Sequence, residues 1–366
     1  MHKKRMVVKV GTSTLTQGTY HLAYPRIVEL ARQIHDIHQQ GWQVVLVSSG
    51  AIAAGREALQ FPQIEKHLPV KQMLAAVGQP RLMAVYKQIF SLYGVSVGQL
   101  LLTRTDITNR KSYINARSTF ESLLAQGILP VVNENDSIAT DEIGIGDNDT
   151  LSALVANMLE ADLLVLLTDI DGIYLGDRGQ AGAEPIREIR APEIPADVWE
   201  AVGGSHSGLG TGGMVTKLQA AEIARRSGTA VIITNGTRPD ILPSIAAGEM
   251  PGTCIYPTVD TMEGRKRFLL ASALKGMGVV IDAGAKRALR EGGSLLAVGI
   301  VAARGEFQRG DVIFIYDEQG KQFALGRSAY ASTRSIASRD CTPSRSKLNW
   351  GISIQMRSSI TTIWSF

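Results

Sequence analysis

The sequence predicts an α/β fold of three layers, a mainly parallel sheet covered by helices on both faces, followed by a small β-rich domain. Two observations carry this prediction. Up to about residue 255, short and almost wholly apolar segments alternate with amphipathic helical patterns, as in βαβ units whose strands are buried on both faces. Beyond about residue 276, short strand-like segments separated by turns replace this alternation.

The first elements follow from apolar spacing. The run VVKVG predicts a buried strand that ends at Gly11, and residues 25–39 carry apolar side chains at helical spacing before Gly41, a common helix terminator. WQVVLVSSG predicts the second strand. AIAAGREAL and VKQMLAAVGQPRLMAVYKQIFSLYG predict two helices, and the second is expected to pause at residues 78–80, which end in proline.

The remaining elements continue the alternation. VSVGQLLLT, ILPVVNEND, ADLLVLLTD and TAVIITNG predict strands, and helices are expected to begin near Thr150 and at Met214. In the last part, GVVIDAGAKRAL, SLLAVGIVAARGEF and GDVIFIYDEQGKQFALGRSAY are interpreted as short strands with hairpin turns, one of them at 317–320. We therefore expect domains at 1–258 and 276–333, the second incomplete, and an aberrant tail at 334–366.

Composition excludes several classes of protein. An apolar content of 45% and a charged content of 20% are those of a globular chain, and 366 residues suggest two or three domains. The two cysteines cannot form a disulfide framework and have no metal-ligand spacing around them. We find no apolar run long enough to span a bilayer and no signal peptide. A cytoplasmic protein without a membrane partner is expected.

The net charge of +4 and the pI near 9.0 invite a nucleic-acid interpretation. However, five of the 38 basic residues and one of the 34 acidic residues lie in 332–366, which leaves 33 of each sign in 1–331. The body of the chain is neutral, so a nucleic-acid partner is not expected.

Small polar residues follow four of the expected strands. Because ligands bind beyond the carboxyl ends of parallel strands, these residues predict one shared site. They are Gly11-Thr12-Ser13, Ser48-Ser49-Gly50, residues 133–136 and Thr168-Asp169.

Three further features carry the chemistry, and each has a plainer alternative. Lys9 lies in an apolar strand before a glycine turn, where it would neutralise phosphate charge unless it is an edge lysine facing water. SGLGTGGMVTKLQAA joins a glycine-rich loop to a helix start and Lys217, an anion site unless the loop is only a surface loop. The acidic residues of NENDSIATDEIGIGDNDT include Asp149, and they suit an amino-acid substrate unless they only cap a helix.

Taken together, these motifs resemble the amino-acid kinase superfamily, and most closely its members that phosphorylate glutamate. The resemblance covers about nine-tenths of the chain, through VVKVGTS, SSGAIAAGR, KQMLAAVGQ, NEND, GDND, LLTDIDG and GLGTGGMVTKLQAA and on into 276–330. It implies the three-layer fold of that superfamily and ATP-dependent phosphorylation of the side-chain carboxylate of L-glutamate to L-glutamyl 5-phosphate, the first step of proline biosynthesis. The C-terminal domain resembles a PUA domain, a fold best known from RNA-modifying enzymes.

The resemblance also implies roles for single residues. Lys9 and Lys217 would flank the transferring phosphoryl group, and Asp149 would orient both lysines. The residues that match the family's glutamate site are Ser49, Asp136 and Asn148. The residues that match its ATP site are Lys9, Thr168, Asp169, Thr211, Gly212, Gly213, Met214, Val215, Thr216 and Lys217. Val215 departs from the pattern, because similar sequences often carry a hydroxyl residue there, and this puts one side-chain contact in doubt.

The chemistry agrees with these roles. Phosphoryl transfer needs positioning and charge neutralisation more than covalent catalysis. A carboxylate acceptor is already ionised at neutral pH, so no catalytic base is required. Mg²⁺ is expected to arrive with ATP, and no dedicated metal site is expected. The resemblance further implies a homo-oligomer, a dimer or tetramer, and feedback inhibition by L-proline.

Two alternative functions remain open. One is a kinase of the same superfamily acting on acetylglutamate, aspartate or carbamate. The other is an RNA-binding protein that acts through the PUA-like domain, which the neutral body of the chain disfavours.

The tail does not fit the resemblance, which stops at about Thr333. The codons of Asn349-Trp350-Gly351, read from each third base, encode Leu-Gly whatever codons were used. Neighbouring codons permit strings that look like the end of a PUA domain. We hypothesise that a one-base slip near Thr333, in the gene or in its sequencing, replaced the C-terminus. Resequencing the gene tests this, and an unbroken frame encoding the tail would refute it.

Overall fold

The computed structural model of the chain describes residues 3–19, 21–60, 67–138, 148–176, 184–203, 213–258, 273–290, 295, 297–307, 312–328 and 332. The chain divides into two compact units, Met1–Thr261 and Met262–Phe366. Each unit is described by itself.

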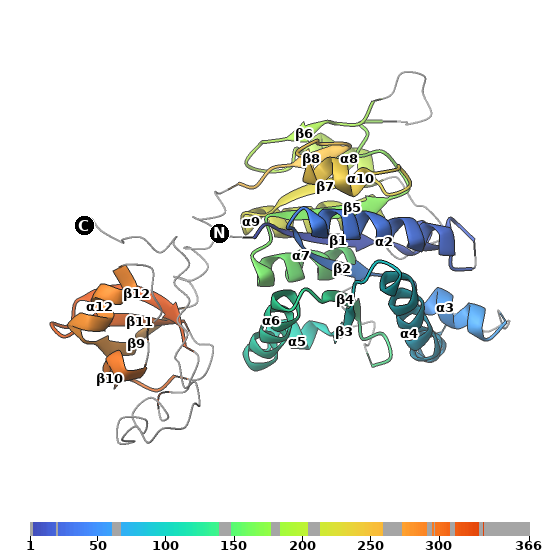
Figure 1. Cartoon of the computed structure of the whole chain (residues 1–366). Coiled ribbons are helices and arrows are strands. Elements are labelled where there is room, and N and C mark those ends of the chain that lie inside the picture. The colour runs from blue at the N-terminus through green and yellow to red at the C-terminus, as the bar shows by residue number, and fades with distance from the viewer. Residues whose placement is uncertain are drawn as a thin grey trace. The chain divides into compact units, whose positions relative to one another are not determined.

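Within its described residues, the first unit is built on an eight-stranded sheet with the order β3-β4-β2-β1-β5-β7-β8-β6. All neighbouring strands run parallel except β7 and β8, which are antiparallel (Figure 1). The strands are β1 (Arg5–Val10), β2 (Gln43–Ser48), β3 (Val97–Leu102), β4 (Leu129–Glu134), β5 (Leu163–Thr168), β6 (Glu188–Ile189), β7 (Ala230–Asn235) and β8 (Thr253–Ile255).

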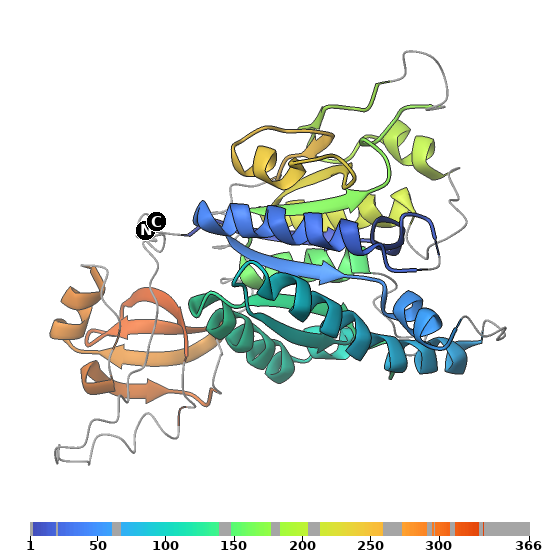
Figure 2. The same cartoon turned by 45° about the vertical axis from the view of Figure 1, so that its right-hand side comes forward.

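Helices cover both faces of this sheet. One face packs against α6, α7, α8 and α9, and the other against α1, α2, α3, α4 and α10; in Figure 2 the long blue helix α2 lies in front of the strands. The helices are α1 (Thr12–Thr16), α2 (Tyr24–Gln39), α3 (Ala51–Ala58), α4 (Leu68–Ser91), α5 (Arg104–Thr108), α6 (Arg110–Ala125), α7 (Asn148–Leu159), α8 (Ala196–Gly203), α9 (Met214–Arg226) and α10 (Ile241–Ala246).

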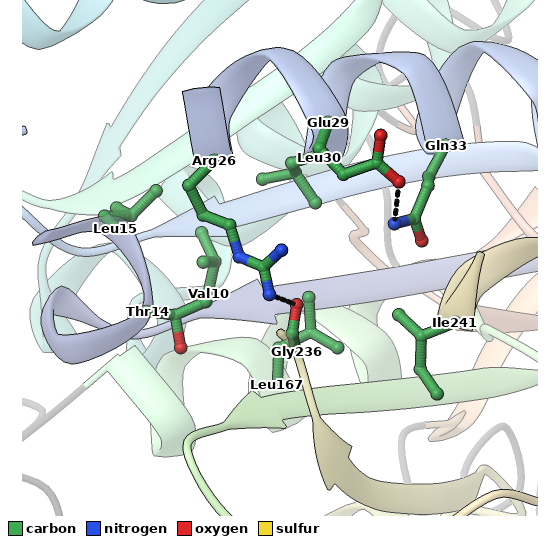
Figure 3. Close-up of a pocket in the computed structure, with 10 residues that line it drawn as sticks. All are labelled: Val10, Thr14, Leu15, Arg26, Glu29, Leu30, Gln33, Leu167, Gly236 and Ile241. Atoms are coloured by element: carbon green, nitrogen blue, oxygen red, sulfur yellow. Dashed lines mark hydrogen bonds between the residues drawn. The ribbon is translucent and has the colours of Figure 1, made fainter. Parts of the chain in front are cut away.

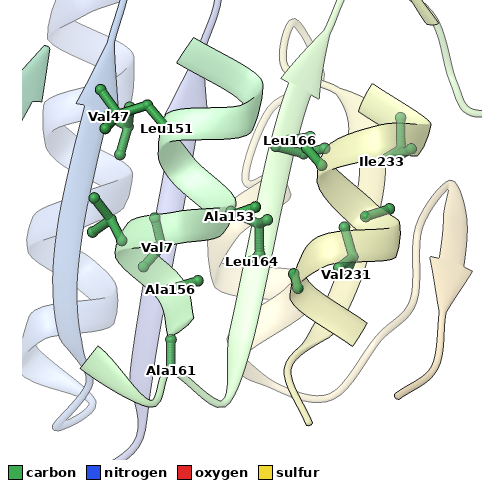
Figure 4. Close-up of a cluster of buried hydrophobic side chains, with 14 of the residues drawn as sticks. Val7, Val47, Leu151, Ala153, Ala156, Ala161, Leu164, Leu166, Val231 and Ile233 are labelled. Atoms are coloured by element: carbon green, nitrogen blue, oxygen red, sulfur yellow. The ribbon is translucent and has the colours of Figure 1, made fainter. Parts of the chain in front are cut away.

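The apolar strands supply both cores because successive side chains of a strand point to opposite faces. Val7 belongs to the core beneath α7, whereas Met6 and Val8 belong to the core beneath α2. Figure 4 shows α7 lying across β1, β2 and β5, with Ala153 and Ala156 directed at the strands. Small residues on this helix let it approach the sheet closely, which fixes the position of its first turn.

The second unit contains a four-stranded sheet among its described residues, in the order β10-β9-β11-β12. Its apolar core includes Ile281, Leu289 and Ile315. The hairpin expected at 317–320 is present, with Gly320 N–H donating to the Asp317 carbonyl at 2.9 Å. The elements are β9 (Ala273–Ile281), α12 (Ala283–Arg290), a 3₁₀ turn at Ala297–Gly299, β10 (Ile300–Arg304), β11 (Val312–Asp317) and β12 (Gln322–Arg327).

The fold class expected from the sequence is therefore confirmed, but two local expectations are wrong. Residues 283–290 form a helix instead of a strand, because their apolar residues lie at helical spacing. The helix α4 continues through Pro80 without a pause. Two other expectations gain detail, since the helix expected near Thr150 begins at Asn148 and the turn at Gly11 leads directly into the short helix α1.

Tertiary packing explains why α4 stays helical on both sides of Pro80. Buried residues hold the helix on both sides of Pro80, with Leu74 before it and Tyr86 after it. Gly78 packs so closely on α3 that an added Cβ would lie 1.8 Å from the Ala51 carbonyl oxygen. These contacts outweigh the cost of a proline within a helix.

Candidate active site

The polar side chains expected in one site do follow neighbouring strands at one edge of the sheet. Val10, the last residue of β1, pairs in register with Ser48 of β2 and with Leu167 of β5. The three strands therefore end level with one another, and the segments that follow them leave the sheet side by side. The edge so formed is where parallel α/β sheets bind their ligands.

Lys9, Asp149 and Lys217 meet at this edge. Lys9 lies two residues after Val7 and so projects from the same face of β1, the face covered by α7 and α9. Its Nζ is 2.6 Å from Asp149 Oδ1, and Lys217 Nζ is 3.2 Å from Asp149 Oδ2. Only 5% of Lys9 and 6% of Lys217 are exposed, and Asp149 is fully buried. One carboxylate thus holds two buried ammonium groups.

The Asp149 carboxylate stays ionised in this surrounding. Burial alone would raise its pKa, but the charges of Lys9 and Lys217 and a hydrogen bond from Thr216 together hold the pKa below its usual range. The Thr216 Oγ1 to Asp149 Oδ2 distance is 2.8 Å. Together the two lysines and Asp149 carry one positive charge. Such a cluster is suited to stabilise negative charge on a phosphoryl group.

A second group of side chains, made of neutral amides and a hydroxyl, adjoins the lysines. Asn148 is the neighbour of Asp149 in the first turn of α7, and its Nδ2 lies 2.9 Å from Ser49 Oγ and 2.9 Å from Asn133 Oδ1. Asn133 is the penultimate residue of β4 and is 2% exposed. Gly50, which follows Ser49, has a φ of +101°, a conformation that favours glycine. The backbone therefore turns here in a way that directs Ser49 toward Asn148.

Asp136 lies just beyond the end of β4 and carries a perturbed carboxyl group. Burial, and secondarily the charge of Glu134, raise its pKa to about 6. Burial and a like charge destabilise the ionised form of this carboxyl group, and a nearby cation would stabilise it. It is therefore suited to bind an ammonium group.

Apart from Lys9 on β1, the positions expected to bind ATP lie at the end of β5, directly after it, and in residues 211–217, which lead into α9. Thr168 ends β5 and donates a hydrogen bond to Asp169 Oδ1 at 3.0 Å. Gly213 is the N-cap of α9, and Met214 and Val215 pack against the core of the first unit. Thr211 and Gly212 lie outside the described residues.

A pocket lies near the carboxyl ends of β1 and β5, between these strands and α2 (Figure 3). The Arg26 guanidinium enters it and donates a hydrogen bond to the Gly236 carbonyl oxygen. Burial lowers the pKa of Arg26. The residues that line the pocket are Val10, Thr14, Leu15, Arg26, Glu29, Leu30, Gln33, Leu167, Gly236 and Ile241.

Comparison with known proteins shows the family of the chain. A model of the amino acid kinase family matches residues 4–235, which is more than half of the chain. The chain belongs to the amino acid kinase family. A model of the PUA domain matches residues 277–335 of this amino acid kinase.

Curated relatives and one solved structure agree with the family. The chain is 49% identical to glutamate 5-kinase of Photobacterium profundum over 332 residues, 90% of this chain and 87% of that protein. It is 48% identical to glutamate 5-kinase of Herpetosiphon aurantiacus, over 90% of this chain and 89% of that protein. Carbamate kinase from Giardia lamblia bound to AMP-PNP superposes with a TM-score of 0.50 at 20% identity, over 69% of this chain and 98% of that chain. This last likeness supports the fold alone.

The structure thus brings together the expected groups Lys9, Asp149 and Lys217, and separately Ser49 and Asn148. Their roles stay predictions. Reasoning from the sequence placed Asn133 in the polar cluster at the end of β4 but assigned it no role. Gln79 stood only as the last residue of the motif KQMLAAVGQ, and nothing in the sequence indicated that its Oε1 accepts a hydrogen bond from Asn133 Nδ2 at 2.9 Å.

Proposed function

We propose that this amino acid kinase transfers the γ-phosphoryl group of ATP to the side-chain carboxylate of L-glutamate, giving L-glutamyl 5-phosphate in the first step of proline biosynthesis. One observation carries the proposal: the first turn of α7 joins two kinds of chemistry. Asp149 holds two lysines, which are suited to bind a phosphoryl group. The adjacent Asn148 contacts Ser49, and these two polar side chains are suited to bind an amino acid. The 49% identity to a glutamate 5-kinase over 90% of the chain supports glutamate as that amino acid.

The geometry accounts for the reaction without a catalytic base. A glutamate carboxylate oxygen attacks the γ-phosphorus, the bond from that phosphorus to the β–γ bridging oxygen breaks, and ADP leaves with the bond's electron pair. Because the carboxylate is ionised at neutral pH, no proton has to be removed. Lys9 and Lys217 lie on either side of Asp149 and neutralise the charge on the equatorial and leaving oxygens. Asp149 keeps both ammonium groups in place and is a positioning residue.

Glutamate is held through its α-amino and α-carboxylate groups. Asp136 and Asn148 supply acceptors for the ammonium group, and Ser49 supplies a hydroxyl. Binding at these groups places the side-chain carboxylate toward the lysines, which is the orientation that direct transfer requires.

ATP lies along the ends of β5 and α9, in contact with Thr168, Asp169 and residues 211–217, and Mg²⁺ enters with it as part of the substrate. The Asp149 carboxylate forms ion pairs with two lysines, and the role proposed for it is to hold those ammonium groups. Within the described residues, no group of three or more His, Cys, Asp or Glu side chains could hold a metal ion. When bound with ATP, Mg²⁺ would neutralise part of the phosphate charge.

The test is an ADP-release assay with MgATP and each of four acids: glutamate, acetylglutamate, aspartate and carbamate. Hydroxylamine is present, because it converts an acyl phosphate to a stable hydroxamate. We expect ADP release and hydroxamate with glutamate and little with the others. Turnover of another acid without turnover of glutamate would refute the assignment. Salt-dependent RNA binding without kinase activity would favour an RNA-binding protein instead.

Further parts of the proposal rest on the family. They are a homo-oligomer, either dimer or tetramer, and feedback inhibition by L-proline. A cytoplasmic location, and kinase and PUA-like domains at 1–258 and 276–333, the second incomplete, are proposed from the sequence. In the part of the chain that the structure describes, no helix is both long and apolar enough to cross a membrane. The tail at 334–366 lies outside the described residues. Its origin in a frameshift stays a prediction.

A further inference from the structure

A chain of buried amides runs from the middle of α4 to the proposed glutamate site. Gln79, 7% exposed, lies on α4, and Asn133, 2% exposed, lies on β4. Asn133 Nδ2 donates to Gln79 Oε1 at 2.9 Å, and Asn148 Nδ2 donates to Asn133 Oδ1 at 2.9 Å. The three side chains come from parts of the chain 54 and 15 residues apart. They connect a core helix to a residue that contacts Ser49.

The backbone N–H of Glu134 sets the direction of the hydrogen bonds that join these three amides. The Glu134 N–H is only a donor, and it lies 2.9 Å from Asn133 Oδ1. The oxygen of the Asn133 amide therefore faces Glu134, and its NH₂ group faces α4. Gln79 must then present its oxygen, since two NH₂ groups cannot hydrogen-bond to each other.

The same logic orients Asn148. Its NH₂ group faces acceptors on three sides, namely Asn133 Oδ1, Ser49 Oγ and the Ser48 carbonyl oxygen, the last at 3.3 Å. The Asn148 Oδ1 atom is left buried and, among the described residues, without a hydrogen-bond partner. A buried acceptor without a partner is costly unless a ligand supplies a donor. An amino acid's ammonium group is such a donor.

The position of Gln79 is coupled to the same site through the backbone. Its neighbour Gly78 packs on Ala51 so closely that an added Cβ would meet the Ala51 carbonyl oxygen at 1.8 Å. Ala51 opens α3, two residues after Ser49. The contact between α3 and α4 therefore sets the distance from Gln79 to the residues that it orients.

We propose that Gln79 is a positioning residue for the amino-acid substrate: its side-chain oxygen fixes the Asn133 amide, which in turn directs Asn148 Oδ1 at the substrate's ammonium group. This inference rests on the proposed function and adds to it a residue that helps the site to select an amino acid. Without the Gln79 oxygen, the Asn133 NH₂ group is buried without an acceptor. The Asn133 side chain is then held only at its oxygen, by the Glu134 N–H and by Asn148, so it no longer fixes the orientation of Asn148 Oδ1 toward the substrate.

The test compares Gln79→Met, which keeps the length of the side chain and loses the acceptor, with Gln79→Glu, which keeps an acceptor oxygen. For Gln79→Met we expect the KM for glutamate and its Kd by calorimetry to rise about tenfold, the effect of losing one hydrogen bond's worth of binding. The KM for ATP should change less than twofold. Gln79→Glu should recover most of the affinity for glutamate.

Gln33→Met is the matched control. Gln33 is similarly buried and hydrogen-bonded, to Glu29 at 2.8 Å and to the Leu242 N–H at 3.0 Å, but it joins α2 to α10. This variant should lower Tm without changing either KM. If Gln79→Met behaves like Gln33→Met, or raises both KM values equally, Gln79 has only a structural role and the inference is wrong.

The wild-type arm separates this inference from the proposed function. If the wild type does not turn over glutamate, the proposed function fails. The comparison of Gln79→Met with Gln79→Glu is then made with the amino acid that the wild type phosphorylates. An unchanged KM there would overturn the inference independently.

Discussion

The two ends of strand β1 each carry a buried cation, and they use it differently. At the amino end, Arg5 is 4% exposed and binds both oxygens of Glu121, at 2.9 and 2.6 Å, and the Leu159 carbonyl oxygen at 2.8 Å. At the carboxyl end, Lys9 is 5% exposed and shares the single carboxylate of Asp149 with a second lysine. Both cations lie on the same strand and are buried to nearly the same degree.

The difference lies in the balance of charge. One guanidinium faces one carboxylate at the amino end, so the charges match and the fork of donors is filled. At the carboxyl end two ammonium groups face one carboxylate, which leaves one positive charge among these three side chains. Burying such a charge is costly, and an anionic substrate offsets the cost. We therefore predict a structural role for the pair of Arg5 with Glu121 and a functional role for the group of Lys9, Asp149 and Lys217.

The largest expected effect comes from removing a cation at the functional end. Lys9→Met and Lys217→Met should each lower kcat by about 10³-fold, because each lysine stabilises charge on the transferring phosphoryl group. The KM for glutamate should change little. Steady-state ADP release with glutamate and MgATP measures both constants.

Arg5→Met is the matched control on the same strand. It removes a similarly buried cation from a carboxylate, so it should lower Tm while leaving kcat per folded molecule near that of the wild type. A loss of kcat equal to that of Lys9→Met would break the comparison, because the two ends of β1 would then not differ in role.

The second prediction removes the shared carboxylate. Asp149→Asn should lower kcat by about 10²-fold, because the lysines lose the group that holds them in place. It should also lower Tm, since two buried ammonium groups then repel each other. MgATP should raise the Tm of this variant more than that of the wild type, because the phosphates replace the lost negative charge. Thermal unfolding with and without MgATP tests this, and an equal shift in both proteins would contradict it.

The positions of Lys9, Asp149 and Lys217 could be anticipated from the sequence because each is marked by a signal close to it in the chain, whereas their roles stay predictions. Lys9 stands before a glycine turn, Asp149 opens a helix, and Lys217 follows a glycine-rich loop. Each of these signals is local, and parallel strands bring local signals at their carboxyl ends to one edge. The alternating apolar pattern likewise predicted the three layers.

Residues whose role depends on packing between distant elements could not be found in this way. Gln79 lies in a helical pattern interrupted by a proline, and its partner Asn133 is 54 residues away. Whether they meet depends on how α4 packs on β4 and on the glycine contact with α3. Arg5 is similar, since its partner Glu121 is 116 residues away on α6. No periodicity or motif contains such pairings.

The third prediction concerns Asp136, whose pKa is raised to about 6 by burial and by the charge of Glu134. The ionised form binds the substrate's ammonium group, so kcat/KM for glutamate should fall about tenfold per pH unit below pH 6 and level off above it. At about pH 7.5, Asp136→Asn should raise the KM for glutamate about 30-fold, as expected for a charged hydrogen bond. This variant should also lose the pH dependence, and retention of it would assign the titration to another group.

Stability should change in the opposite sense. The folded-state pKa of Asp136 lies above the unfolded value, so the protein is favoured while the carboxyl is protonated and loses that stability as pH rises through about 6. Without glutamate, Asp136→Asn should therefore raise Tm at about pH 8 and change it less at about pH 5. Adding glutamate at the higher pH should raise the Tm of the wild type more than that of the variant. An Asp136→Asn protein less stable than the wild type at the higher pH would refute the assigned cause.

The smallest expected effect comes from Thr216, whose hydroxyl lies 2.8 Å from an Asp149 oxygen. The Gly213 carbonyl oxygen lies at the same distance, 2.8 Å, but the hydroxyl has one proton, and the carboxylate is the stronger of the two acceptors. Thr216→Val keeps the shape and loses this hydrogen bond, so kcat should fall about fivefold, and Thr216→Ser should restore it. The same hydrogen bond helps to lower the pKa of Asp149, so the acidic limb of the kcat profile should move to higher pH in Thr216→Val. A lowered kcat without that movement would mean that Thr216 acts on ATP directly and not through the lysine pair.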